Sequence, residues 1–252
     1  MINNNTNLDY KISVIIPCFK CSETIERAIM SVVNQSLTPY EIILIEDHSD
    51  DNSKTINKLI TLQTKFKNYI KIFKNKKNMG PGFSRNLGWE KARGNLIAFL
   101  DADDTWHLKK LETQFEFLKK NPQIDVVCNF DKYNLNYKNK KIDVKKNSDI
   151  EKVNYNKMLF KNVVSTRSVL IKKSIENRFN STFWYSEDYW LWLNLLYKGK
   201  KIIKLPLYLS GYYKKPSSNE GLSSHLLNFF ISEFMVLKSQ PSNSFQKIII
   251  KY

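Results

Sequence analysis

Apolar residues in the first 130 positions follow two alternating spacings. Short runs rich in β-branched residues, such as 11–17 (KISVIIP) and 40–46 (YEIILIE), predict buried strands. Between such runs, apolar residues recur at helical spacing, as at Ile25, Ala28 and Ile29. The same criteria predict further strands at 70–73, 96–100 and 125–130, and helices after Ser22, around 56–60, from 80 to about 94, and at 108–119.

This alternation with short connections predicts an α/β fold, with a mostly parallel central sheet flanked by helices. The later part of the chain is less regular. We expect a polar loop at 131–152, a strand at 166–172, a helix at 186–197, a strand pair at 201–214 and a terminal helix at 222–237. We therefore divide the chain into a main domain at 1–220 and a C-terminal helical extension at 221–252.

Composition limits the protein class. The chain has 252 residues, of which 42% are hydrophobic, so it can form a sizeable core and is not a disordered chain. It contains no apolar stretch of about 18 residues and no apolar N-terminal signal, which argues against a spanning helix and a secretory leader. Three cysteines do not make a disulfide framework and fit a reducing cytoplasm.

The net charge of +16 attracts anions such as nucleic acid, lipid headgroups or phosphorylated small molecules. An equally simple interpretation is that many lysines lie on solvated surfaces. Charge therefore does not choose a function, although it is compatible with a cytoplasmic protein that contacts the anionic inner face of the cytoplasmic membrane.

The strongest local pattern is Asp101-Ala102-Asp103 directly after an apolar run. Two carboxylates at i and i+2 can face one divalent ion, and Mg²⁺ or Mn²⁺ commonly combines one or two carboxylates with substrate phosphates. The alternative is structural: Asp101 ends a strand, and Asp104 or Thr105 caps the next helix.

Two further polar groups follow predicted strands. Glu46 and Asp47 could accept hydrogen bonds from a nucleobase or a ribose, or form a solvated turn. Gly80 and Gly82 at a predicted helix start would let the backbone approach a ligand closely. Arg85 could bind a diphosphate or hold a carboxylate.

Glu187 and Asp188 begin a helix that is apolar on nearly all sides and therefore buried. Either carboxylate could act as a general base towards a hydroxyl group. The alternative is an ordinary helix start in which Ser186 caps the helix and both acids favour its dipole. Cys18 and Cys21, with two residues between them, leave a redox pair as a minor alternative.

Four segments together resemble the family-2 glycosyltransferases of GT-A fold. They are 11–20 (KISVIIPCFK), 41–51 (EIILIEDHSDD), 78–104 (NMGPGFSRNLGWEKARGNLIAFLDADD) and 186–214 (SEDYWLWLNLLYKGKKIIKLPLYLSGYYK). The resemblance implies inverting transfer of a sugar from a nucleotide-diphosphate sugar, typically a UDP-sugar, to an acceptor hydroxyl. It also implies Mn²⁺ or Mg²⁺ as cofactor.

The resemblance assigns roles residue by residue. Asp188 would be the catalytic base with Glu187 beside it, and Asp103 with Asp101 would hold the metal. The nucleotide-sugar would contact Pro17, Phe19, Glu46 or Asp47, Gly80, Arg85, Asp101, Ala102 and Asp103. Glu46 and His48 stand where the family more often has Asp and Gly, and Lys214 stands where Arg is common.

The chain lacks the Gln-x-x-Arg-Trp pattern of processive polysaccharide synthases, which favours single-sugar addition in surface polysaccharide assembly, with a glycan or lipid-linked acceptor. We expect acceptor contacts from 131–165 and 215–240, and homo-oligomerisation through 222–237 is a hypothesis. The alternatives are a basic nucleic-acid-binding α/β domain, which the strand-end acids disfavour, and an inactive glycosyltransferase-like protein.

Overall fold

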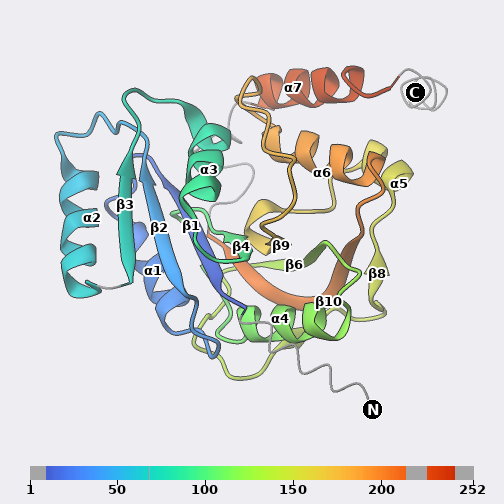
Figure 1. Cartoon of the computed structure of the whole chain (residues 1–252), viewed down its shortest axis with the longest axis horizontal. Helices are drawn as coiled ribbons and strands as arrows, with labels where there is room; N and C mark the ends of the chain where they lie inside the picture. Colours follow the sequence, from blue (N-terminus) through green and yellow to red (C-terminus); the bar gives the residue numbers. More distant parts are fainter. Residues whose placement is uncertain (1–9, 68, 214–225, 242–252) are drawn as a thin grey trace, which may run out of the picture.

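A ten-stranded mixed sheet organises the computed structural model, which describes residues 10–67, 69–213 and 226–241 (Figure 1). The strand order is β3-β2-β1-β4-β9-β6-β10-β5, and β7 and β8 pair separately with β10. The first half contains β1 (Ile12–Cys18), α1 (Ile25–Val33), β2 (Glu41–Glu46), α2 (Lys54–Lys65), β3 (Ile70–Lys74), α3 (Gly80–Lys91) and β4 (Leu96–Phe99).

The second half contains more and shorter elements. They are β5 (Thr105–Trp106), α4 (Lys110–Lys120), β6 (Val126–Tyr133), β7 (Asp143–Val144), β8 (Glu151–Lys152), α5 (Tyr155–Phe160), the 3₁₀ turn η1 (Thr166–Ser168), β9 (Leu170–Lys172), α6 (Glu187–Tyr197), β10 (Ile202–Tyr212) and α7 (Leu226–Lys238). The pairs among β1 to β4, and β6 with β10, are parallel. The short strands β5, β7, β8 and β9 pair antiparallel. The predicted α/β fold with flanking helices is confirmed.

Strand β1 is buried at nearly every position because helices cover both faces of the sheet. Val14 and Ile16 belong to a core shared with α1, α2 and α4. Ile15 points to the other face, where Trp89 of α3 and Trp192 of α6 belong to a second core. A continuous apolar run, rather than an alternating one, is the sequence signature of such a two-sided strand.

Several predicted elements differ in detail. The strand pair expected at 201–214 is wrong: 202–212 is one long bulged strand, β10, that pairs with β6. The polar region 131–152 is mostly loop, but it carries the end of β6 and the short strands β7 and β8. The strand expected at 166–172 is divided into η1 and β9. Helix α1 begins at Ile25, with Thr24 rather than Ser22 at its N-cap.

Helix α7 confirms a terminal helix within the predicted extension, although its first predicted residues, 222–225, lie outside the described residues. The predicted boundary at 220 also lies outside them. Val236 of α7 belongs to the second core, and α7 lies beside α6 at the edge of the molecule (Figure 1).

Candidate active site

Carboxylates from both halves of the chain meet beyond the ends of the parallel strands. The backbone leaves β4 and forms a turn in which the Asp104 amide donates to the Asp101 carbonyl at 3.1 Å. Parallel strands present their carboxyl ends on one side, where ligands of open α/β sheets bind. The start of α6, with Glu187 and Asp188, faces this turn through Arg85 of α3.

Arg85 bridges the two halves of this acidic cluster. Its Nη2 lies 2.6 Å from Asp101 Oδ1, and its Nη1 lies 2.5 Å from Glu187 Oε1. Burial opposes the charge on Arg85, but the two carboxylates raise its pKa above the ordinary value, so it remains a cation. Of the two roles expected for Arg85, the structure shows carboxylate binding.

The two carboxylates that Arg85 binds have pKa values shifted in opposite directions. Burial disfavours ionisation of Asp101, but Arg85 and then Arg167 outweigh it and lower the pKa of Asp101. Burial raises the pKa of Glu187 to about 7, against the effect of Arg85 and with a contribution from the neighbouring Asp188. Because Glu187 is buried and Arg85 binds it directly, we interpret it as a structural partner of Arg85.

Asp188 has a different set of contacts. The Thr166 hydroxyl donates to its Oδ2 at 2.8 Å, and the Tyr189 amide donates to its Oδ1 at 2.7 Å. Burial raises the pKa of Asp188, while Thr166 and Arg85 work in the opposite direction. A carboxylate with a raised pKa that no arginine binds directly is the better candidate for a general base. Ser186 does not cap α6, because it adopts a left-handed conformation with φ of 58° and makes no capping bond.

A second arginine, Arg167 of η1, fixes the other side of the turn. It forms an ion pair with Asp104, and its Nε lies 3.8 Å from Asp131 Oδ2 at the end of β6. Burial raises the pKa of Asp104 well above its ordinary value, with Arg167 opposing it. The predicted capping role of Asp104 or Thr105 is therefore wrong: Asp104 binds Arg167, and Thr105 begins β5.

Glu46 and Asp47 at the end of β2 have distinct partners. Asp47 accepts from the Asn75 side chain at 2.7 Å and from the Met79 and Gly80 amides at 2.8 Å each. It thus fixes the start of α3, although burial raises its pKa. The Glu46 side chain accepts a local bond from the Ser49 amide, at 2.7 Å. Glu46 is consequently the better candidate for the predicted base contact.

The two glycines at the start of α3 permit close packing within the protein. Gly80 has φ of +81°, and a Cβ there would lie 3.3 Å from the Trp184 ring. A Cβ on Gly82 would lie 2.8 Å from Glu187 Cγ. The close approach expected at these positions is therefore made by Trp184 and Glu187, which places α6 near Arg85.

The remaining predicted contact residues lie around the same strand ends. Asp103 and Ala102 follow Asp101 in the turn, and the Asp103 carbonyl accepts from Arg27 Nη2 at 2.7 Å. Pro17 is half-buried near the end of β1, and Phe19 just after it is exposed. Their predicted roles towards a nucleotide stay predictions.

Sequence reasoning did not single out Arg167, Thr166 or Arg27. Arg27 lies in α1, and its guanidinium stacks on the Tyr213 ring, with 3.8 Å to the ring centroid. Arg167 and Thr166 lie in a short polar segment without a recognisable pattern, and only the fold brings them to the acids. Cys18, Cys21 and Cys128 are free and buried, and burial raises the pKa of Cys18, which disfavours a reactive redox pair.

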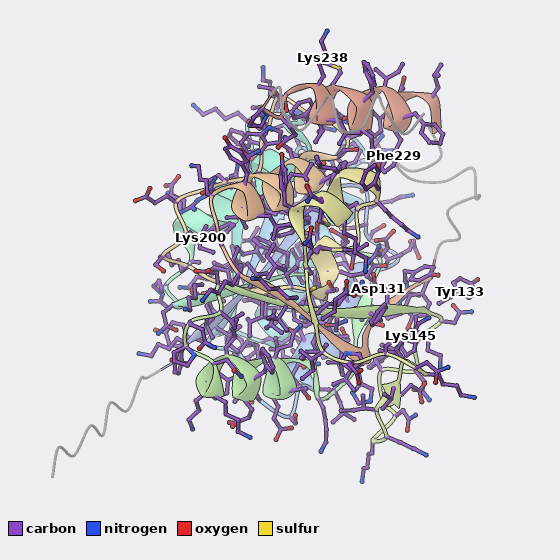
Figure 2. All side chains as sticks on the ribbon, turned by 90° about the vertical axis from the view of Figure 1, so that its right-hand side faces the viewer. Asp131, Tyr133, Lys145, Lys200, Phe229 and Lys238 are labelled. Carbon is purple, nitrogen blue, oxygen red and sulfur yellow. The ribbon has the colours of Figure 1, made fainter. Side chains whose placement is uncertain are left out.

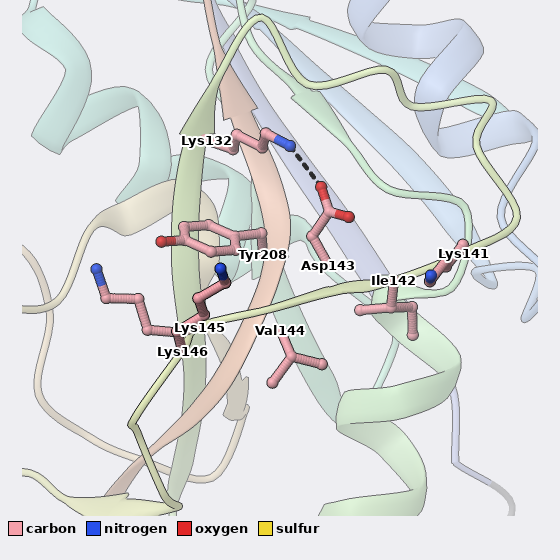
Figure 3. A pocket seen from close by; sticks show the side chains of 8 residues that line it. All are labelled: Lys132, Lys141, Ile142, Asp143, Val144, Lys145, Lys146 and Tyr208. Carbon is pink, nitrogen blue, oxygen red and sulfur yellow. Dashed lines mark hydrogen bonds and ion pairs between the residues drawn. The ribbon is translucent and has the colours of Figure 1, made fainter.

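A separate hollow of about 700 Å³ lies under β7, against β10 (Figure 3). Its lining is strongly basic. It consists of Lys132, Lys141, Ile142, Asp143, Val144, Lys145, Lys146 and Tyr208. Lys132 forms an ion pair with Asp143, and Lys145 lies 6.0 Å from the centroid of the Tyr208 ring. This surface suits an anionic ligand.

Among the helices that the structure describes, none is long and apolar enough to cross a membrane. No group of three or more histidine, cysteine or acidic side chains among residues 10–67, 69–213 and 226–241 is arranged as a complete metal site. A metal held by two carboxylates and a diphosphate would not need such a group.

Comparison with known proteins gives the family. The model of glycosyl transferase family 2 matches residues 13–179. The chain is 32% identical to the Escherichia coli UDP-Glc:alpha-D-GlcNAc-diphosphoundecaprenol beta-1,3-glucosyltransferase WfgD, over 75% of this chain and 70% of that protein. It is 30% identical to a second E. coli enzyme of the same description, WfaP, over 94% of this chain and 90% of that protein.

The fold also has a solved counterpart. Staphylococcus aureus TarS 1-349, in a crystal structure with UDP, superposes with a TM-score of 0.67 at 18% identity, over 90% of this chain and 64% of that chain. This likeness confirms the predicted GT-A fold, and the family match confirms the prediction of a glycosyltransferase. The chain therefore belongs to glycosyl transferase family 2 and is a glycosyltransferase.

Proposed function

We propose that this glycosyltransferase moves a hexose from a UDP-sugar to a hydroxyl group of a lipid-linked glycan in the assembly of a surface polysaccharide. WfgD and WfaP act, by their descriptions, on a diphosphoundecaprenol-linked sugar with UDP-Glc as donor. The observation that carries the proposal is Arg85, which joins a carboxylate of the predicted donor side, Asp101, to the start of α6 that bears Asp188.

Asp101 and Asp103 fit a divalent cation chemically. Both are carboxylates in one turn, and these hard oxygen donors suit Mg²⁺ and Mn²⁺. Arg85 binds Oδ1 of Asp101, whose side chain is 30% exposed, so that residue can still offer an oxygen. When bound, such a cation would stabilise the negative charge that develops on the leaving nucleoside diphosphate.

The side chains of this chain supply the remaining chemistry. Asp188 would take the proton from the acceptor hydroxyl as the hydroxyl oxygen attacks the anomeric carbon. Attack from the side opposite the leaving diphosphate inverts that carbon. Arg85 keeps Glu187 in place and so positions the first turn of α6, and Thr166 orients the Asp188 carboxylate.

Thermal unfolding in the presence of ligands tests the proposal. We expect UDP to raise the melting temperature only when Mn²⁺ or Mg²⁺ is present, because a ligand that binds the native state stabilises it. Asp103→Ala should abolish this shift without unfolding the apoprotein. Asp149→Ala, at an exposed acid in the loop before β8, is the matched control. A UDP shift that needs no metal, or that survives in Asp103→Ala, would contradict the metal role.

We further propose that the enzyme acts in the cytoplasm, at the inner face of the cytoplasmic membrane, where lipid-linked acceptors and nucleotide-sugars meet. The lining residues of the hollow in Figure 3, apart from Tyr208, belong to 131–165, the region from which acceptor contacts are expected. Its positive charge suits the phosphates of such an acceptor. Homo-oligomerisation stays a hypothesis.

A further inference from the structure

Helix α7 has an apolar surface on the side that faces away from the protein. Ser232, Val236 and Gln240 are buried against the body. On the opposite side, large apolar residues recur at helical spacing, and each is between 49% and 73% exposed. They are Leu227, Phe230, Ile231, Phe234 and Met235. A continuous exposed apolar surface of this kind marks an interaction site.

The helix is fixed against the segment that leads to the candidate base. The Ser232 hydroxyl donates to the carbonyl of Tyr185, three residues before Asp188. At the other end of α7, the Tyr155 hydroxyl of α5 donates to Gln240 at 3.3 Å. These contacts join α7 to α5 and to the chain segment that carries Asp188.

The segments next to α7 also expose aromatic residues. Trp184 adjoins Tyr185 in the chain, and Tyr197 stacks near Tyr155 with 5.9 Å between ring centroids. Trp184 and Tyr197 are 44% and 57% exposed. Amphipathic aromatic side chains are enriched at the boundary between lipid and water.

Each of the three neighbouring helices α5, α6 and α7 ends at or just before an exposed lysine. Lys238 lies on the outer side of α7, Lys161 follows α5, and Lys198 follows α6, and all three are exposed. Figure 2 shows Lys238 pointing away from the body, above the layer of α5 and α6. An apolar helix surface bordered by lysines is typical of helices that bind anionic membrane surfaces.

We propose that α7 docks on the surface of an anionic lipid bilayer, with its exposed apolar side chains in the headgroup region. This inference rests on the proposed lipid-linked acceptor, which would lie in the same bilayer on which α7 docks. A second copy of the chain is the less favourable occupant. A symmetric dimer would bring the surface against itself, and the exposed lysines of both copies would face one another.

Vesicle sedimentation of the full chain tests the proposal without any substrate. The probes are vesicles of phosphatidylglycerol and phosphatidylethanolamine, compared with vesicles of phosphatidylcholine alone. We expect binding to the anionic vesicles, weakened at least about tenfold in Phe230→Ser/Phe234→Ser, because two apolar anchors are lost. The control Tyr40→Ser/Ile60→Ser changes two exposed apolar residues away from α7 and from the hollow of Figure 3, and it should bind like the wild type.

Equal vesicle binding of the wild type and Phe230→Ser/Phe234→Ser would overturn the proposal, and so would no binding by the wild type. A dimer in light scattering that becomes monomeric in this variant would assign the surface to a second copy and overturn it too. The UDP-induced melting shift, measured on the same proteins, separates the two inferences. A retained shift without vesicle binding rejects only the membrane docking, whereas a lost shift rejects the proposed donor binding.

Discussion

The turn after β4 and the start of α6 both present adjacent acids at one edge of the sheet, but they hold them differently. In the turn, Arg85 binds Asp101 and Arg167 binds Asp104, so two arginines fix the backbone. At the start of α6, Arg85 binds Glu187, while the side chain of Asp188 accepts a hydrogen bond from the Thr166 hydroxyl. The partner, and not the position in the sequence, distinguishes a structural acid from a chemically available one.

Helix geometry explains why two neighbours differ so much. Consecutive helical residues point about 100° apart, given 3.6 residues per turn. Glu187 therefore points towards Gly82 and Arg85 of α3, and Asp188 points towards η1. Either acid was a possible base from the sequence; these contacts favour Asp188.

Asp188→Asn should have the largest effect on transfer. An amide cannot take the acceptor proton, so we expect the rate to fall about a thousandfold. UDP binding should persist, because the donor side is unchanged. Sugar transfer from UDP-sugars and UDP-induced melting shifts measure the two effects.

Glu187→Gln is the matched substitution at the neighbouring position. It should lower stability more than Asp188→Asn does, and it should retain more transfer activity in the folded fraction. Equal losses of transfer in the two variants, at equal folded fractions, would mean that the two acids act together. Glu187 would then not be a purely structural acid.

Arg85→Met should have the largest effect on stability. It leaves Glu187 buried without its cation, and removing one partner of a buried ion pair costs about 3–5 kcal/mol. Urea unfolding measures the free energy. In the control, Arg93→Met, the arginine side chain is 59% exposed and its partner Glu41 keeps Lys71, so the cost should be below about 1 kcal/mol. Similar losses in both variants would refute a special role of Arg85.

The sequence predicted the regular half of the molecule well, because two-sided strands such as 11–17 carry an unbroken apolar signal. The sequence also correctly predicted that Asp101 follows a strand and that Asp188 lies at the start of a helix. The single long strand β10 was missed, because its interior Pro206 and bulges resemble a turn between two strands.

Contacts between distant segments explain what the sequence could not predict at the site. Thr166 and Asp188 are 22 positions apart, and Arg85 and Glu187 are 102 positions apart. Neither separation follows a helical or strand period, so no local pattern encodes these pairs. The fixing of α7 on Tyr185 is likewise a product of tertiary packing.

Thr166→Val gives the smallest and most specific change. Valine matches threonine in shape but lacks the hydroxyl that donates to Asp188 Oδ2 at 2.8 Å. That bond favours the ionised carboxylate, so its loss should raise the pKa of Asp188 further above its ordinary value. Because the base must be ionised, the acidic limb of the pH–rate profile should move to higher pH, by about one unit.

Thr166→Ser keeps the hydroxyl and should keep the wild-type profile, which separates the hydrogen bond from packing at this position. A purely structural role for Thr166 would lower the rate at all pH values equally and leave the limb in place. A limb that moves to lower pH would mean that the hydroxyl favours the protonated acid, and Asp188 could then not be the base that this bond prepares.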